Sequence, residues 1–228
     1  MALSTWTCPL DQGGSCEELL ITYGSGFARK VLIIPPLFDE HNKLRRQLIM
    51  VMRELAAGGV GSFLPDLPGT NESLIDLRKQ SLTGWRKAIS AFRSEYETDR
   101  FFSVRSGAIL VTEESVGLAY SPHSGAAHLR DMVRSRVLTS REAGRHVSSD
   151  AVYAVAREHG AALGGWEIGP QMFRELELAE LPTSEKIAIV DHDGIGGPKL
   201  WLRAEAGSDT RQAVALAEIM LASFEIQT

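Results

Sequence analysis

The chain has 228 residues, of which 44% are hydrophobic and 23% are charged, and its formal net charge is −5. These fractions match soluble globular proteins and argue against the disordered and fibrous classes. The basic residues are scattered and form no stripe that would neutralise a run of phosphates, so nucleic acid is not expected as a partner. The length favours a single domain over residues 1–228.

Cysteine usage and apolar runs indicate the compartment. Cys8 and Cys16 have neither a CxxC spacing nor a Cys/His metal spacing, and the first ten residues do not resemble a secretory leader. No apolar run approaches the roughly 18 residues of a membrane-spanning helix. We therefore expect a cytoplasmic protein that does not span a membrane, while association with a membrane surface stays open. No zinc spacing, P-loop or dinucleotide fingerprint is present, so neither a metal nor a cofactor is expected.

The first third of the chain predicts a hairpin followed by a βαβ unit. Strands are expected at 4–9 and 17–23, on either side of a turn-rich segment. The unbroken aliphatic run at 31–34 is typical of a strand buried on both faces of a parallel sheet. Apolar residues at helical spacing over 43–57 predict a helix, and a further strand follows at 60–64. Such a unit is right-handed.

The remaining chain continues the alternation of helices and strands. Helices are predicted at 82–96, about 125–137, 149–162, 170–178 and 210–224, and strands at 101–104, 116–120 and 186–190. The segment 107–111 fits either a helix or extended chain. This alternation predicts an α/β fold in three layers, with a mostly parallel sheet covered by helices on both faces.

Residues 31–73, VLIIPPLFDEHNKLRRQLIMVMRELAAGGVGSFLPDLPGTNES, resemble the front half of an α/β-hydrolase. In that superfamily the loop after the first of these strands supplies an oxyanion-hole amide. The detail is similar to the hydrolases associated with exosortase A systems in bacterial exopolysaccharide loci. The residues that carry this similarity are Pro36, Glu40, Asn42, Lys43, Arg45 or Arg46, Asp66-Leu67-x-Gly69, Gly165-Trp166-Glu167-Ile168 and Gly197-Pro198-x-x-Trp201. The resemblance implies an α/β-hydrolase-like sandwich and a link to exopolysaccharide production.

The nucleophile of an α/β-hydrolase sits on a strained turn between a strand and a helix, written G-x-S-x-G, with small residues two positions before and after it. The sequence after the strand at 101–104 offers two centres for this turn. Arg105 is flanked by Ser103 and Gly107, whereas Ser106 has the β-branched Val104 two positions before it. The steric rule favours Arg105. A guanidinium stays protonated and has no lone pair, so it cannot act as a nucleophile.

Two functions follow from this segment. The first is a serine hydrolase of ester or related acyl bonds, with Ser106 as nucleophile, His192 as base and Asp191 or Asp193 orienting the imidazole. Amides near Leu37 and Gly107 would form its oxyanion hole. The competing interpretation of His192, in its D-H-D-G context, is an exposed turn residue. The other histidines are interpreted as surface or core residues.

The second function is a non-catalytic protein whose pocket binds a small molecule. Arg105 would hold a carboxylate or phosphate by bidentate hydrogen bonds, with Leu37, Phe38, Glu40 and Asp66 lining the same site. Other interpretations stay open: Glu40 in a helix cap, and Asp66 as a turn former or as a structural partner of Arg105. Because two of the three triad positions fit the geometry poorly, the sequence favours this second function with a degenerate triad.

Overall fold

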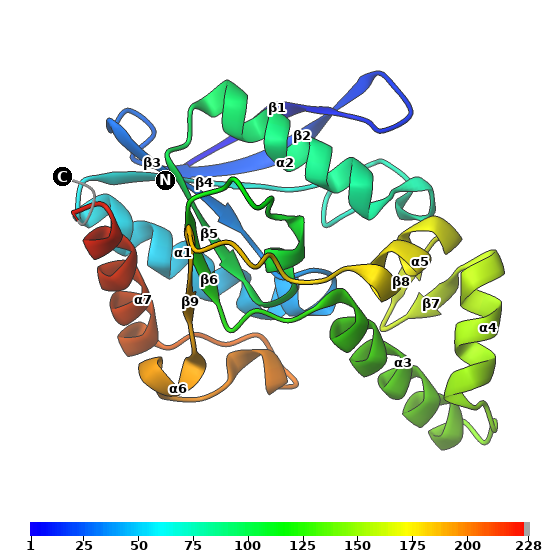
Figure 1. The fold of residues 1–228 in the computed structure, drawn as a ribbon. Helices are drawn as coiled ribbons and strands as arrows, with labels where there is room; N and C mark the ends of the chain where they lie inside the picture. The colour runs from blue at the N-terminus through cyan, green and yellow to red at the C-terminus, as the bar shows by residue number, and fades with distance from the viewer. Residues whose placement is uncertain (226–228) are drawn as a thin grey trace.

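The computed structural model of the chain describes residues 1–225, and its centre is a seven-stranded sheet (Figure 1). Across the sheet the order is β1-β2-β4-β3-β5-β6-β9. β1 pairs antiparallel with β2, and β2 with β4, while all later neighbours are parallel. The strands are β1 (Ala2–Pro9), β2 (Ser15–Tyr23), β3 (Arg29–Ile34), β4 (Val60–Pro65), β5 (Arg100–Val104), β6 (Gly117–Tyr120) and β9 (Ile187–Val190).

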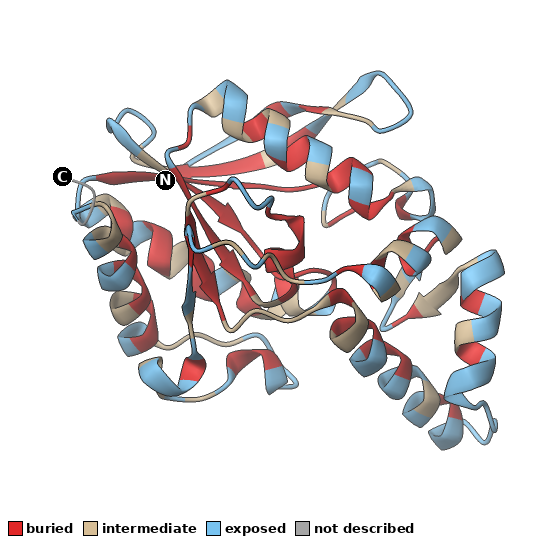
Figure 2. Cartoon of the chain, in the orientation of Figure 1, coloured by how far each residue is buried: buried red, intermediate tan, exposed pale blue. Residues whose placement is uncertain are grey.

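Helices cover both faces of the sheet, which explains why the last four residues of β3, Val31 to Ile34, are all apolar. Val31 and Ile33 pack in one apolar cluster with the buried faces of α1 (Asp39–Ala57) and α7 (Thr210–Ser223). Leu32 and Ile34 point the other way, into a cluster with α2 (Leu82–Tyr96). Side chains alternate between the faces of a strand, so a strand covered on both faces needs an apolar residue at every position. The predicted three-layer α/β sandwich is confirmed (Figure 2).

Between β6 and β9 the chain builds a side lobe, defined here as residues 125–178, which projects from one end of the sheet (Figure 1). It consists of α3 (Gly125–Glu142), α4 (Ser149–His159), β7 (Ala161–Leu163), β8 (Trp166–Ile168) and α5 (Pro170–Leu178). The helix predicted over 149–162 is too long. Gly160, with φ of 76°, ends α4, and residues 161–163 then pair with β8 in a small antiparallel hairpin.

The rest of the chain forms short elements around the sheet. They are the 3₁₀ helices η1 (Leu77–Lys79), η2 (Arg105–Leu110) and η3 (Leu200–Leu202), and the single-turn helix α6 (His192–Ile195). The segment left open at 107–111 therefore lies mostly in a 3₁₀ helix. The helix predicted at 43–57 begins four residues earlier, at Asp39. No helix within residues 1–225 is long and apolar enough to cross a bilayer.

Gly107 allows the turn after β5 to approach the end of β3. A methyl group at this position would lie 2.7 Å from the carbonyl oxygen of Ile34 and closer still to that of Pro35. We expect Gly107→Ala to lower the free energy of unfolding by about 2 kcal/mol, because backbone has to move to admit the methyl group. Urea unfolding followed by circular dichroism measures the change. Gly26→Ala is the control, since nothing lies within 4 Å of its added methyl group; equal losses in the two variants would contradict the expectation.

Candidate functional site

Backbone strain gathers at the carboxyl ends of the central strands. Five non-glycine residues among 1–225 have positive φ, and four of them follow consecutive elements of the parallel sheet: Phe38 (54°) after β3, Asn71 (48°) after β4, Arg105 (53°) after β5 and Ser121 (44°) after β6. Such conformations are costly for side chains with a Cβ and cluster at functional sites. This edge is also where open α/β sheets bind ligands. It is therefore the candidate site.

Arg105 tops the turn that follows β5. Its φ of 53° marks the sharp reversal from β5 into η2, and Gly107 packs against the backbone of Pro35 at the end of β3. The next residue, Ser106, is not among the residues with positive φ, and its side chain is fully buried. The side chain presented by the turn is thus a cation.

The guanidinium of Arg105 is held on three sides. Nε and Nη2 donate to the two carboxylate oxygens of Glu40, at 3.2 and 3.3 Å. Nη1 donates to the backbone oxygen of Ser121 at 3.2 Å. The flat face lies 4.6 Å from the ring centroid of Trp201, which is a cation–π distance. The side chains of Arg105 and Glu40 are 11% and 14% exposed, so solvent still reaches the pair.

Ser106 and Leu37 lie together, in a hydrogen bond. The backbone N–H of Leu37 donates to Ser106 Oγ at 2.9 Å, and the side chain of Ser106 has no exposed surface. The Leu37 amide, expected in an oxyanion hole, therefore donates its hydrogen bond to Ser106, the residue expected as nucleophile. Phe38 follows directly as the residue before α1, with its ring buried between Trp85 and Trp166.

His192 lies in a separate buried network. Its Nδ1 is 2.6 Å from the hydroxyl of Tyr120, and its Nε2 is 3.1 Å from the backbone oxygen of Gly197. Burial raises the pKa of Tyr120 to about 12. Within residues 1–225, no hydrogen bond joins His192 to Ser106 or to Asp191, which precedes the short helix α6. The interpretation of His192 as an exposed turn residue is wrong, because only 6% of it is exposed.

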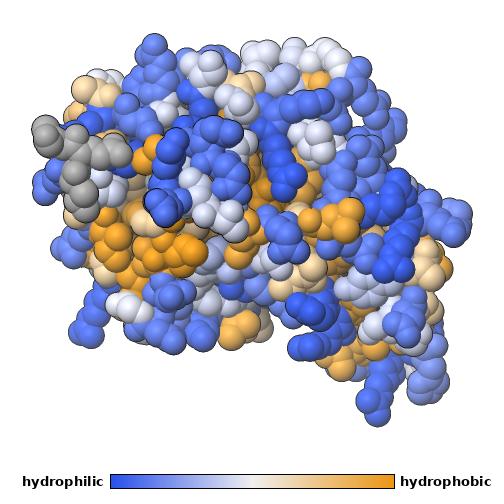
Figure 3. All heavy atoms as spheres, viewed as in Figure 1, coloured by the Kyte–Doolittle hydropathy of each residue, from blue (hydrophilic) through white to orange (hydrophobic). Residues whose placement is uncertain are grey.

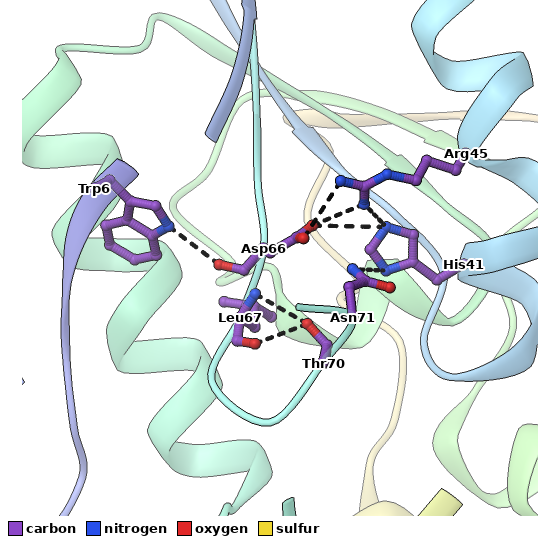
Figure 4. Close-up of polar contacts among 7 residues, drawn as sticks. All are labelled: Trp6, His41, Arg45, Asp66, Leu67, Thr70 and Asn71. Atoms are coloured by element: carbon purple, nitrogen blue, oxygen red, sulfur yellow. Dashed lines mark hydrogen bonds and ion pairs between the residues drawn. The ribbon is translucent and has the colours of Figure 1, made fainter. Parts of the chain in front are cut away.

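A second polar network fixes the loop after β4 (Figure 4). Asp66, at the end of β4, accepts hydrogen bonds from Arg45 Nη1 at 2.8 Å and Nη2 at 3.3 Å, and its backbone oxygen accepts one from Trp6. Arg45 Nη1 also lies 2.9 Å from His41 Nε2, and His41 Nδ1 lies 3.5 Å from Asn71 Nδ2. Asp66 therefore pairs with Arg45, and the pairing with Arg105 considered from the sequence is wrong.

His41 serves this network as a neutral ring. Burial, assisted by Arg45, lowers its pKa to about 4 although Asp66 acts in the opposite direction. A neutral imidazole has one nitrogen without a proton, and Nε2 in that state accepts the hydrogen bond that Arg45 donates. Arg45 and Asn71 form part of the wall of an open groove of about 670 Å³ that extends along α1 to β1. The network can thus hold the groove wall in shape without changing its own charge near neutral pH.

One further buried histidine was not among the candidates from the sequence. His128, in the first turns of α3, is 4% exposed and stacks on the ring of Phe38, with centroids 5.8 Å apart. Burial lowers its pKa to about 4, with smaller contributions from His123 and Arg105. Its Nε2 has no hydrogen-bond partner among the described residues. The spacing of four residues between His128 and the apolar Met132 is the sequence signal that places His128 on the buried face.

Comparisons with known proteins identify the fold. No protein-family model matches the chain, and no curated protein does. Among solved structures, Est1E from Butyrivibrio proteoclasticus with bound ferulic acid is 13% identical, with a TM-score of 0.58 over 96% of this chain and 99% of that one. The thioesterase domain from the curacin biosynthetic pathway is 17% identical, with a TM-score of 0.52 over 97% and 100%. Mouse α/β-hydrolase domain-containing protein 10 is 12% identical, with a TM-score of 0.53 over 99% and 98%. The chain has the α/β-hydrolase fold; at these identities the likeness shows the fold alone.

The pair formed by Asp66 and Arg45 is expected to stabilise the fold. Asp66→Asn removes a carboxylate that is 1% exposed and leaves Arg45, which is 22% exposed, without its counter-charge. We expect the free energy of unfolding to fall by about 2 kcal/mol, measured in urea, because breaking a buried pair from one side leaves a desolvated charge. Glu158→Gln is the control, since that side chain is 77% exposed and its pair with His159 contributes little. Equal effects of the two changes would rule out the assignment.

His128 is expected to make stability depend on pH. Its pKa of about 4 in the folded chain lies below the ordinary 6.5, so the unfolded chain binds the proton more readily. The stabilisation is complete above about pH 6.5 and falls as pH drops toward 4, by about 1.4 kcal/mol per unit. His128→Leu should therefore flatten the decline in the free energy of unfolding between about pH 7 and 5. The exposed His159, changed to Gln, is the control, and an unchanged slope in His128→Leu would contradict the prediction.

Proposed function

We propose that this protein uses the α/β-hydrolase fold to bind a small anionic molecule at Arg105 and does not form an acyl-enzyme. One observation carries the proposal. The side chain that tops the turn after β5 is an arginine held by a carboxylate in bidentate geometry, at the position where this fold presents its nucleophile. A guanidinium supplies no lone pair for attack, but its fork of donors fits a carboxylate or a phosphate.

The surroundings of Ser106 and His192 support a site without the acyl-enzyme step. A nucleophilic serine needs a base within hydrogen-bond reach and access to the substrate carbonyl. Ser106 is fully buried, and its Oγ accepts a hydrogen bond from the backbone N–H of Leu37. Both nitrogens of His192 are engaged by Tyr120 and Gly197. A degenerate triad is therefore part of the proposal.

Glu40 supports anion binding because it occupies the place that a ligand carboxylate would take. Its hydrogen bonds to Arg105, at 3.2 and 3.3 Å, are longer than the 2.7–2.9 Å that is usual between charged partners. Glu40 comes from the first turn of α1, where its side chain keeps some exposure. A carboxylate or phosphate from solution would displace it and would keep the contacts of Arg105 with Ser121 and Trp201.

The proposal also extends to the pathway and the cell compartment in which the protein works. The resemblance of residues 31–73 to exosortase-associated hydrolases supports a role in bacterial exopolysaccharide production. The two free cysteines, which face each other across the hairpin of β1 and β2, support a reducing cytoplasmic location.

A set of thermal shifts tests the binding site. We expect carboxylates and phosphates to raise the melting temperature of the wild type, to raise that of Glu40→Gln further, and to leave Arg105→Ala unchanged, because Glu40 competes with the ligand. Arg157→Ala is the matched control: it removes an arginine held by Glu177 in a similar bidentate pair on the side lobe. If anions stabilise Arg105→Ala as much as the wild type, the site is elsewhere. If none stabilises the wild type or Glu40→Gln, Arg105 binds no such anion.

A fluorophosphonate probe tests the absence of an acyl-enzyme. We expect no labelling of the folded chain, since the side chain of Ser106 has no exposed surface. Intact mass spectrometry detects the adduct, and Ser106→Ala gives the background. Labelling that disappears in both Ser106→Ala and His192→Gln would instead support a serine hydrolase that uses His192 as its base.

A further inference from the structure

The free end of the side lobe carries a concentration of positive charge. We define the basic tip as residues 130–147, which comprise the outer part of α3 and the loop that leads to α4. Between Arg130 and Arg145 the sequence has five arginines and two acidic residues, in a chain whose net charge is −5. All five arginines are exposed, and none forms an ion pair with another of the described residues. The tip is thus positive while the rest of the chain is negative.

Three of the four arginines of α3 share one side of the helix, while Arg136 lies on the other side. Arg130, Arg134 and Arg141 are spaced by four and seven residues, which places them above one another along the axis. Arg145 follows in the loop after α3. Like charges one turn apart repel each other and destabilise a helix. Of the two acidic residues here, Asp131 pairs with His123 and not with these arginines. The stripe therefore favours an anionic surface that lies outside the chain.

Apolar side chains are interspersed with these charges. Leu138, on the arginine side of α3, is 53% exposed, and Val147 in the following loop is 37% exposed. A groove of about 580 Å³ runs between Val137, Arg141, Arg145, Val147 and Ala151. Figure 3 shows apolar surface beside hydrophilic surface on the projecting lobe. A soluble polyanion would use only the charges, whereas a lipid bilayer takes up both kinds of side chain.

We propose that the basic tip docks on an anionic membrane surface. The arginines would contact lipid headgroups, and Leu138 and Val147 would enter the boundary between headgroups and acyl chains. The lobe projects from the sheet (Figure 1), so its end reaches a flat surface ahead of the negatively charged remainder of the chain. The attachment is peripheral and independent of ligand binding at Arg105.

Vesicle co-sedimentation of the full chain tests this surface. The probes are vesicles of phosphatidylglycerol mixed with phosphatidylcholine, and vesicles of phosphatidylcholine alone, at about 0.1 M salt. We expect binding to the anionic vesicles only, weakened at higher salt. Arg134→Gln, Arg141→Gln and Arg145→Gln together should lower the partition coefficient about tenfold or more. The control removes three exposed arginines elsewhere, by Arg46→Gln, Arg203→Gln and Arg211→Gln, and should retain most of the binding.

A second variant separates a bilayer from a soluble polyanion. Leu138→Gln with Val147→Gln keeps every charge of the tip, and we expect it to bind anionic vesicles several-fold more weakly than the wild type. Unchanged vesicle binding by this variant, together with equal binding of wild type and variant to duplex DNA, would make the tip a surface for soluble polyanions and overturn the proposal. The proposal would also be overturned if the wild type did not bind anionic vesicles, or if the control triple variant lost as much binding as the tip variant. Circular dichroism checks that each variant is folded.

Discussion

The close approach of the turn after β5 to the end of β3 is the constraint on which the site depends. Gly107 lies against the backbone oxygens of Ile34 and Pro35, at a distance that excludes a Cβ. This contact sets the turn so that Arg105 points from the sheet edge toward α1 and Ser106 points into the protein. The hydrogen bond from the Leu37 amide to Ser106 Oγ then joins the two strand ends. This backbone geometry therefore places Arg105, and not Ser106, at the top of the turn after β5.

The first turn of α1 distributes the charges of the site into two networks. Glu40 faces Arg105, while the next residue, His41, lies beside Arg45 and Asp66. Consecutive residues on a helix point about 100° apart, so one turn can serve both neighbours. Each carboxylate forms an ion pair with one arginine, Glu40 with Arg105 and Asp66 with Arg45. His41 stays neutral because burial lowers its pKa. The two networks tie the loops after β3, β4 and β5 to a single helix end.

The side lobe has a different physical character from the sheet. Its inner residues belong to the same apolar cluster as α2 and one face of the sheet, with Leu129 and Met172 in contact with that cluster. Its outer end has few buried side chains, unpaired arginines and exposed apolar residues (Figure 2). Packing therefore holds the base of the lobe, and the tip is left for solvent or for a partner. The proposed ligand site at Arg105 and the proposed docking surface at the tip lie in separate parts of the chain.

Most of the helices and strands, and the residue at the centre of the turn after β5, were predictable from the sequence. The aliphatic run of β3 and the amphipathic patterns of α1 and α2 predicted the layers, because burial on one or two faces leaves a periodic trace in the sequence. The small residues around Arg105 favoured it as the centre of the turn, because the steric rule is local. The hairpin of β7 and β8 was missed, since three-residue strands are too short to show a period. The hydrogen-bond partners were not predictable in this way: they are Glu40 for Arg105, Arg45 for Asp66, Leu37 for Ser106 and Tyr120 for His192. The partners in these pairs come from different segments of the chain, and no sequence period records which distant side chains the packing brings together.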